Sequence, residues 1–262
     1  MIKVVRAFAS ATVSGEKDLN EDSVIVLPEK MLFGIADGYG GQNIGDAASK
    51  AVLGNVKYFV EHGLGDSEVT LPFVFRSYYT DSSNMIFNAI LFANQKLVEE
   101  NKRHHINARG GASVLFGFFE GRHLTLANVG TCGAFLVRPG LSQPIVVPLL
   151  TPRSYQAKRG PQASEPHLVG WNFPLISCGH KTDVEPEIIE LQVQKGDIIF
   201  LSSDGLFSWL QKEDLAGLEE LSEVSEQEPL SDKIGHYLDS LLDTAKKRGA
   251  KENMSGILLL CA

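Results

Sequence analysis

Two short motifs, each an aspartate followed by glycine, stand at the ends of apolar runs far apart in the chain. Asp37-Gly38 follows the run 31–36, and Asp204-Gly205 follows the run 198–201. Each pattern predicts a buried strand that leads into an Asp-Gly turn, where the carboxylate is held rigidly and the glycine allows close approach. Carboxylates brought together in this way bind hard divalent cations such as Mg²⁺ or Mn²⁺.

Two more acidic motifs belong to the same argument. Glu21-Asp22 leads the second predicted strand and Glu252-Asn253 leads the last one. Taken singly, an Asp-Gly pair is usually an ordinary turn, and Glu252-Asn253 is an ordinary exposed loop. If the strand ends converge, however, the clustered carboxylates repel one another unless cations offset the repulsion. No His or Cys stands beside these motifs, which favours Mg²⁺ or Mn²⁺ over zinc.

Closely spaced strands and a few long helices are expected to position these residues. Apolar residues at every fourth position predict the first helix, and tight glycine turns favour antiparallel pairing of the middle strands. Runs of strands separated by long helices favour an α+β fold with stacked antiparallel sheets. Strands are predicted at 4–11, 23–27, 31–36, 112–119, 124–129, 133–137, 187–193, 197–202 and 256–261, and helices at 45–62, 74–102, 206–210 and 232–247.

Composition limits the class of protein. The 262 residues are 44% hydrophobic, and we expect one domain over 1–262 with an irregular, flap-like segment at about 139–181. The net charge of −8 argues against nucleic acid or an anionic membrane as the main partner. The three widely spaced cysteines predict reduced thiols. Neither a signal peptide nor an apolar stretch of about 20 residues is evident, so we expect a cytoplasmic protein.

The order of the motifs resembles that of the metal-dependent serine/threonine protein phosphatases of type 2C, in their compact bacterial-like form. The resemblance covers nearly the whole chain, from about residue 5 to 261. The motifs that carry it are Asn20-Glu21-Asp22, Asp37-Gly38-x-Gly40-Gly41, Gly110-Gly111-Ala112-Ser113, Ala127-Asn128-Val129-Gly130, Gly196-Asp197, Ser203-Asp204-Gly205-Leu206 and Asn253-Met254-Ser255.

This resemblance implies both a fold and an activity. The implied fold is a four-layer αββα sandwich, in which two antiparallel sheets pack together and helices cover the outside. The implied activity is hydrolysis of phosphoserine and phosphothreonine in proteins, by hydroxide held at a centre of two Mg²⁺ or Mn²⁺ ions. Phosphoproteins are then the substrates, signalling by dephosphorylation is the process, and a protein kinase is an expected partner.

The resemblance also assigns metal-binding roles. Asp37 matches the carboxylate that bridges the two ions, and the carbonyl of Gly38 matches a ligand of the second ion. Asp204 and Glu252 match carboxylates on the first ion. Glu252 replaces the family's usual aspartate and is one methylene longer, which changes the reach of this ligand.

Other positions of the motif lie around those ligands. Glu21 and Asp22 are expected to hold metal-bound waters and orient the site. Lys17 stands where the family has a phosphate-binding arginine, so it keeps the charge but loses the two-pronged fork. Thr131 replaces the aspartate that helps to hold a third metal. Tyr39 stands where some relatives have histidine, a candidate general acid, and its ordinary pKa of about 10 suits that role weakly.

Two classes of function therefore remain open. In the first, the protein is an active phosphatase in which Asp37, Asp204 and Lys17 are catalytic, acting on phosphoproteins or on a small phosphorylated metabolite. In the second, it is a phosphatase-fold binding or regulatory module without catalysis, which the changes at Lys17 and Thr131 favour. His167 and His180, which flank Trp171 in the flap-like segment, either face a substrate or belong to a plain surface loop.

Overall fold

The computed structural model describes residues 4–16, 19–41, 44–62, 73–150, 152–156, 172–223 and 230–262. The strands are β1 (Val5–Val13), β2 (Asp22–Leu27), β3 (Leu32–Gly40), β4 (Gly110–Glu120), β5 (His123–Val129), β6 (Gly133–Arg138), β7 (Ile145–Pro148), β8 (Ser154–Gln156), β9 (Asn172–Pro174), β10 (Glu187–Gln192), β11 (Ile198–Ser202) and β12 (Met254–Cys261). The helices are η1 (Pro28–Lys30), α1 (Ile44–His62), α2 (Asp81–Asn101), η2 (Ile106–Ala108), α3 (Asp204–Phe207), α4 (Lys212–Ala216), η3 (Gly217–Glu223) and α5 (Leu230–Lys247).

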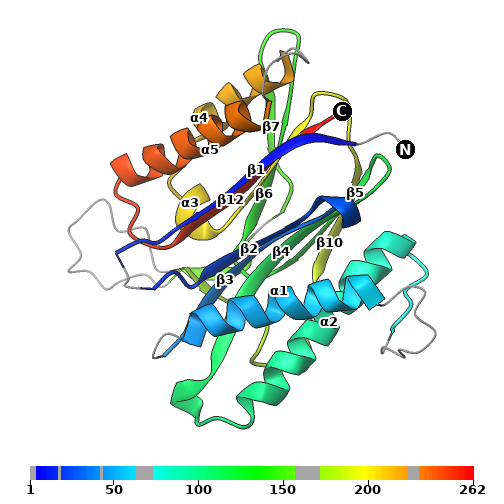
Figure 1. The fold of residues 1–262 in the computed structure, drawn as a ribbon, viewed down its shortest axis with the longest axis vertical. Helices are drawn as coiled ribbons and strands as arrows, with labels where there is room; N and C mark the ends of the chain where they lie inside the picture. Colours follow the sequence, from blue (N-terminus) through cyan, green and yellow to red (C-terminus); the bar gives the residue numbers. More distant parts are fainter. Residues whose placement is uncertain are drawn as a thin grey trace.

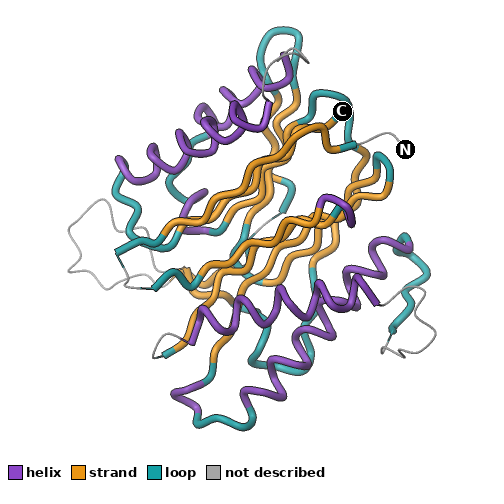
Figure 2. The backbone as a smooth tube through the Cα atoms, viewed as in Figure 1, coloured by secondary structure: helices purple, strands orange, loops and turns teal. Residues whose placement is uncertain are grey.

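Two five-stranded antiparallel sheets form the centre of the molecule. One has the order β1-β12-β11-β6-β7 and the other β10-β5-β4-β3-β2. In Figure 1 the sheets face each other, with α1 and α2 outside the second sheet and α3, α4 and α5 outside the first. Figure 2 shows the same helix–sheet–sheet–helix layering along the backbone. The expected four-layer αββα sandwich is therefore confirmed.

The alternation of side chains along the strands explains why these apolar runs are buried on both faces. In β3, Phe33 and Ile35 join the core between the two sheets, whereas Leu32 and Ala36 join the core under α1 and α2. A third core lies between the first sheet and α5. Because successive residues of a strand point to opposite faces, a strand in the middle of four layers needs a continuous apolar run.

Both Asp-Gly motifs differ from the predicted turns. Strand β3 continues to Gly40 because β4 begins at Gly110 and pairs with it there, so Asp37 lies inside the strand. Asp204 opens helix α3, with Ser203 as the residue before its first turn. A carboxylate at a helix N-terminus is favoured by the unpaired N–H groups and by the helix dipole. The prediction of two turns was therefore wrong, although both aspartates remain at the ends of apolar segments.

The second long helix begins later than predicted. Helix α2 starts at Asp81, after Thr80, whose hydroxyl accepts a hydrogen bond from the N–H of Ser83. The preceding stretch 73–76 carries no helix. Two asparagines of α2 hold this stretch in its non-helical conformation. The Asn88 side chain hydrogen-bonds to the N–H and carbonyl of Val74, and the Asn84 side chain does the same with Arg76. Side-chain amides that pair with a backbone compete with helix formation, which explains the error.

The segment 139–181 contains strand β7 at the edge of the first sheet and the small hairpin β8–β9. His167 and Trp171 lie outside the described residues.

The three cysteines, Cys132, Cys178 and Cys261, are buried free thiols. Among the helices that the structure describes, none is long and apolar enough to cross a membrane.

Candidate active site

Carboxylates from both sheets meet at one end of the sandwich. Asp22 and Asp37 face each other in register on the neighbouring strands β2 and β3. The Asp37 side chain is hydrogen-bonded to both Asp22 and Asp204, and the charge of Glu252 acts on Asp204. We refer to Asp22, Asp37, Asp204 and Glu252 as the carboxylate cluster. The predicted convergence of distant acidic motifs is thus present in the structure.

Burial and mutual repulsion disturb the protonation of this cluster. Burial, followed by the charges of Asp22 and Asp204, raises the pKa of Asp37 well above its ordinary value. Burial also raises the pKa of Asp204 to about 6, against the opposing effect of its hydrogen bonds to Asp37 and Thr131. Burial and the neighbouring charges therefore favour the protonated form of Asp37, and Asp37 and Asp204 share a hydrogen bond. Such sharing is the arrangement expected when crowded carboxylates have no cation to neutralise them.

Close backbone contacts hold the cluster against helix α1. The N–H of Gly38 donates to the carbonyl of Glu21 at 3.1 Å, and the N–H of Glu21 donates to the side chain of Asn253 at 3.1 Å. A Cβ at Gly38 would lie 2.0 Å from the carbonyl oxygen of Gly45, and a Cβ at Gly45 would lie 2.4 Å from Oε1 of Glu21. Both glycines are therefore needed for α1 to approach β3 and for the buried Glu21 side chain to fit.

Two serines that had no role assigned from the sequence, Ser203 and Ser113, lie beside the acids. The hydroxyl of Ser203 donates to Oδ2 of Asp22 at 2.8 Å and accepts from the N–H of Ser255 at 2.9 Å. Ser113 lies opposite Asp37 on β4, and the Thr131 hydroxyl donates to it at 3.1 Å. Ser203 and Ser113 both belong to the motifs that carry the family resemblance. Their place in those motifs is the feature of the sequence that could have identified them.

Asp197, from the Gly196-Asp197 motif, bonds to residues outside the carboxylate cluster. Its buried carboxylate accepts two hydrogen bonds from the guanidinium of Arg138, each of 2.7 Å, and one from the N–H of Gln194. These contacts tie β6 to the turn before β11. Lys17 lies outside the described residues, so its contact with phosphate remains a prediction.

Tyr39 has partners from the segment just after β9. Its hydroxyl is hydrogen-bonded to that of Ser177, and its ring stacks on His180 with centroids 5.5 Å apart and planes 17° apart. Burial raises the pKa of Tyr39 to about 12, although the Ser177 hydrogen bond lowers it. A phenol with so high a pKa is a poor proton donor near neutral pH. No spacing in the sequence indicated these contacts.

The chemistry of the cluster fits hard divalent cations. Its side chains offer only oxygen ligands, as Mg²⁺ and Mn²⁺ prefer. Within the residues that the structure describes, however, no group of three or more His, Cys, Asp or Glu side chains is arranged to hold a metal ion. The carboxyls hydrogen-bond to one another instead. Cations would take the place of the shared proton, and the buried amide nitrogen of Asn253, which has no hydrogen-bond partner among the described residues, could donate to an added oxygen.

Comparison with solved structures gives the fold. Over 98% of both chains, the protein superposes on the serine/threonine phosphatase PstP/Ppp of Mycobacterium tuberculosis with a TM-score of 0.72 and 20% identity. A structure of the PstP catalytic domain with 2 manganese ions gives a TM-score of 0.72 and 21% identity over 99% of both chains. The chain has the fold of the type 2C protein phosphatases. The phosphatase MsPP of Mycobacterium smegmatis, of the same fold, gives a TM-score of 0.70 and 17% identity, covering 99% of this chain and 100% of MsPP.

Similarity in sequence to the type 2C phosphatases is more limited. A probable protein phosphatase 2C 71 from Oryza sativa subsp. japonica is 29% identical over 108 residues, which is 41% of this chain and 19% of the rice protein. The probable protein phosphatase 2C BIPP2C1 from the same subspecies is 29% identical over 110 residues, 42% of this chain and 16% of that protein. No model of a known protein family matches the chain. Relatives in sequence and neighbours in structure are thus serine/threonine phosphatases of one type.

Proposed function

We propose that the protein is a metal-dependent phosphatase that hydrolyses phosphoserine and phosphothreonine in proteins at a centre of two Mg²⁺ or Mn²⁺ ions. The observation that carries the proposal is the contact of Asp37 with Asp22, on the neighbouring strand, and with Asp204, which opens helix α3 after the other sheet's strand β11. This cluster of carboxylate oxygens, in which Asp22 and Asp204 are buried, occurs in a fold that, in PstP, is known with 2 manganese ions. A protein kinase that phosphorylates the same substrates is the expected partner.

In this proposal the carboxylate cluster supplies the ligands. Asp37, the Gly38 carbonyl, Asp204 and Glu252 would hold the two ions. When bound, the ions would lower the pKa of a water and offset charge on the phosphoryl oxygens. Asp37 would give up the proton that it shares with Asp204, because a nearby cation lowers the pKa of a carboxyl.

The neighbouring side chains keep these carboxylates in place. Ser203 holds one oxygen of Asp22, and Thr131 hydrogen-bonds to Asp204. Glu21 and Asp22 orient water around the ions, as groups just outside the ligands commonly do. Lys17 binds the phosphate of the substrate. Because the hydroxyl of Thr131 replaces a carboxylate here, the centre takes two ions instead of three.

Phosphatase assays with and without added Mn²⁺ test this function. We expect Mn²⁺-dependent hydrolysis of p-nitrophenyl phosphate and of a phosphothreonine peptide, reversed by EDTA. Asp37→Asn keeps the shape of the side chain but removes its charge, and should abolish hydrolysis. Asp239→Asn, an exposed change on α5, is the matched control and should behave as wild type. Absence of hydrolysis by the Mn²⁺-loaded wild type, or activity unaltered by Asp37→Asn, would refute the proposal.

One observation favours the alternative of a binding module without catalysis. Among the described residues, no three acids are placed so that they could hold a metal ion together, and in the family resemblance Thr131 offers a hydroxyl in place of a carboxylate. Isothermal titration calorimetry separates the two functions. Tight Mn²⁺ binding that disappears in Asp204→Asn supports the enzyme, whereas absence of Mn²⁺ binding in the wild type supports the module.

A further inference from the structure

A basic surface lies beside the carboxylate cluster, on a protein whose net charge is −8. It consists of Lys102, Arg103, Arg109 and, beside an uncharged His180, Lys181; all but the half-buried Arg109 are exposed, and burial together with the charge of Arg109 lowers the pKa of His180. In Figure 1 the connection from α2 to β4, which carries the first three, lies at the same end of the molecule as the last residues of β3. The pairing of β3 with β4 supports this placement, because Tyr39 and Gly40 of β3 lie opposite Gly111 and Gly110 of β4.

A single buried side chain, that of Asn101, gathers the segments that form this surface. Its amide nitrogen donates to the carbonyls of Gly110 and Gly179, both at 2.7 Å, and its oxygen accepts from the N–H of Gly110 at 3.2 Å. Asn101, Gly110 and Gly179 are the immediate sequence neighbours of Lys102, Arg109 and His180. The basic residues are therefore neighbours in space through one hydrogen-bonding hub.

A second asparagine fixes the backbone on both sides of His180. The side chain of Asn94 accepts from the N–H of Gly179 at 2.9 Å and donates to the carbonyls of Lys181 and Thr182 at 2.8 and 3.1 Å. Lys181 is nevertheless exposed, and His180 keeps an exposed surface although its ring stacks on Tyr39. Exposed side chains on a rigid backbone lose less freedom on binding, and this arrangement suits a binding surface.

The basic surface reaches the candidate active site through the stack of His180 on Tyr39. Tyr39 is two residues from Asp37, and a Cβ at Gly111 would lie 2.7 Å from the Tyr39 hydroxyl and 2.9 Å from Nε2 of His180. The acids in the neighbourhood are Glu99, which lines the same groove as Lys102 and pairs with Lys96, Glu100, which pairs with Arg103 and His104, and the exposed Asp183. Lys102, Arg109 and Lys181 have no ion pair with a described residue.

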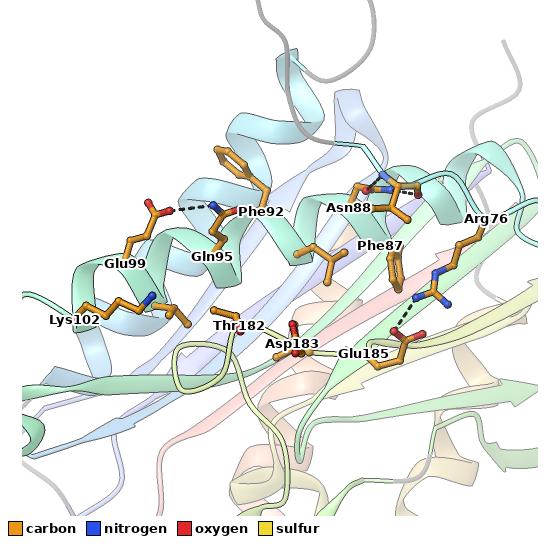
Figure 3. A pocket seen from close by; sticks show the side chains of 14 residues that line it. Arg76, Phe87, Asn88, Phe92, Gln95, Glu99, Lys102, Thr182, Asp183 and Glu185 are labelled. Carbon is orange, nitrogen blue, oxygen red and sulfur yellow. Dashed lines mark hydrogen bonds and ion pairs between the residues drawn. The ribbon is translucent and has the colours of Figure 1, made fainter.

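A groove of about 570 Å³ continues this surface along α2. Figure 3 shows Lys102 and Thr182 toward one end and Arg76, paired with Glu185, at the other. Apolar side chains of α2, including Phe87 and Leu91, line it between these ends. A polypeptide that binds at the basic surface therefore has room to extend beyond it.

We propose that the basic surface binds acidic residues that flank the phosphorylated residue of a substrate protein. The inference rests on the proposed function and names the substrate class of that same site. Attraction between this surface and an acidic segment would orient substrates on a protein that otherwise repels them. Each exposed pair contributes little, but several together give about a tenfold preference.

Short phosphothreonine peptides flanked by Glu or by Lys test the preference. We expect kcat/KM to be about tenfold higher for the Glu-flanked peptide, with the difference shrinking at high salt. In the double variant Arg109→Ala/Lys181→Ala the ratio should fall to within about twofold. Lys30→Ala, at the opposite end of β2 and β3, is the matched control and should keep the wild-type ratio.

The same two peptides can be labelled with a fluorophore, and their binding to the Asp37→Asn protein can be followed by fluorescence anisotropy. This measurement needs no catalysis. Tighter binding of the Glu-flanked peptide that is lost in Arg109→Ala/Lys181→Ala supports the surface. Equal binding of both peptides, or a preference that survives the double variant, overturns it. If the wild type with Mn²⁺ does not hydrolyse even p-nitrophenyl phosphate, the proposed function fails, and the anisotropy still decides the surface.

Discussion

The carboxylate cluster and the basic surface lie next to each other, yet the protein builds them differently. In the cluster, the charged groups of Asp22, Asp37 and Asp204 are brought together, and burial works against their ionisation. In the basic surface, the charges stay largely in water and only the backbone beneath them is buried, through Asn94 and Asn101. Burial disfavours the charged form of the carboxyls in the first region, whereas exposure keeps the charges of the second region hydrated.

The largest effect should come from removing a charge of the cluster. Asp204→Asn retains the shape of the side chain but leaves a neutral amide where the first ion would bind. We expect kcat/KM for p-nitrophenyl phosphate to fall by about a thousandfold, or about 4 kcal/mol of transition-state stabilisation. Steady-state kinetics across Mn²⁺ concentrations measures this. Full activity restored by excess Mn²⁺ would show that Asp204 is not a required ligand.

A change in the buried support of the basic surface should lower the free energy of unfolding. Asn101→Leu removes three hydrogen bonds and leaves the buried backbone groups of Gly110 and Gly179 unpaired. Such a loss costs about 3–4 kcal/mol of unfolding free energy. Urea denaturation measures it, with exposed Asn107→Leu as the control. A loss no larger than in Asn107→Leu would mean that Asn101 does not hold the surface together.

The pH dependence of stability should separate the two regions as well. The pKa of Asp204 is raised from 3.8 to about 6 in the folded protein, so the folded state binds more protons between these values. Stability from this group is present below the ordinary pKa and is lost as pH rises through about 6. Metal-free wild type should therefore lose about 3 kcal/mol more than Asp204→Asn over this range.

Urea denaturation at a series of pH values, with EDTA present, gives this difference. Added Mn²⁺ should restore the lost stability of the wild type near neutral pH and leave Asp204→Asn unchanged. Parallel pH curves for the two proteins would contradict the raised pKa.

The smallest effect is expected at Thr131. Thr131→Val keeps the shape but removes the hydroxyl that bonds to Asp204 and Ser113. Loss of one hydrogen bond to a carboxylate should weaken Mn²⁺ binding by about tenfold or less, near 1 kcal/mol. Calorimetry measures this, with Thr131→Ser as a variant that retains the hydroxyl. If Thr131→Val and Thr131→Ser bind Mn²⁺ equally, the hydroxyl does not position Asp204.

The sequence could predict what depends on local pattern. Apolar runs indicated most of the strands, although not β7, β8 and β9, and the acidic residues beside those runs predicted a cluster if the strand ends converge. It could not predict that β3 continues past Asp37, because this depends on where the distant strand β4 begins. It also missed the extended stretch before α2, which asparagines of that helix hold, and the pairing of Tyr39 with Ser177 and His180. These features rest on contacts between segments that local periodicity does not report.

The origin of the candidate ligands in both sheets has one more consequence. Asp22 and Asp37 belong to the second sheet, whereas Asp204 and Glu252 flank strands β11 and β12 of the first. Ions bound among these residues would connect the two sheets that form the middle layers. The spacing of those layers is set by side chains such as Phe33, Leu115 and Leu259. In the proposed centre, the affinity for metal would therefore also depend on packing in the apolar core, and removing a methylene there would change that affinity.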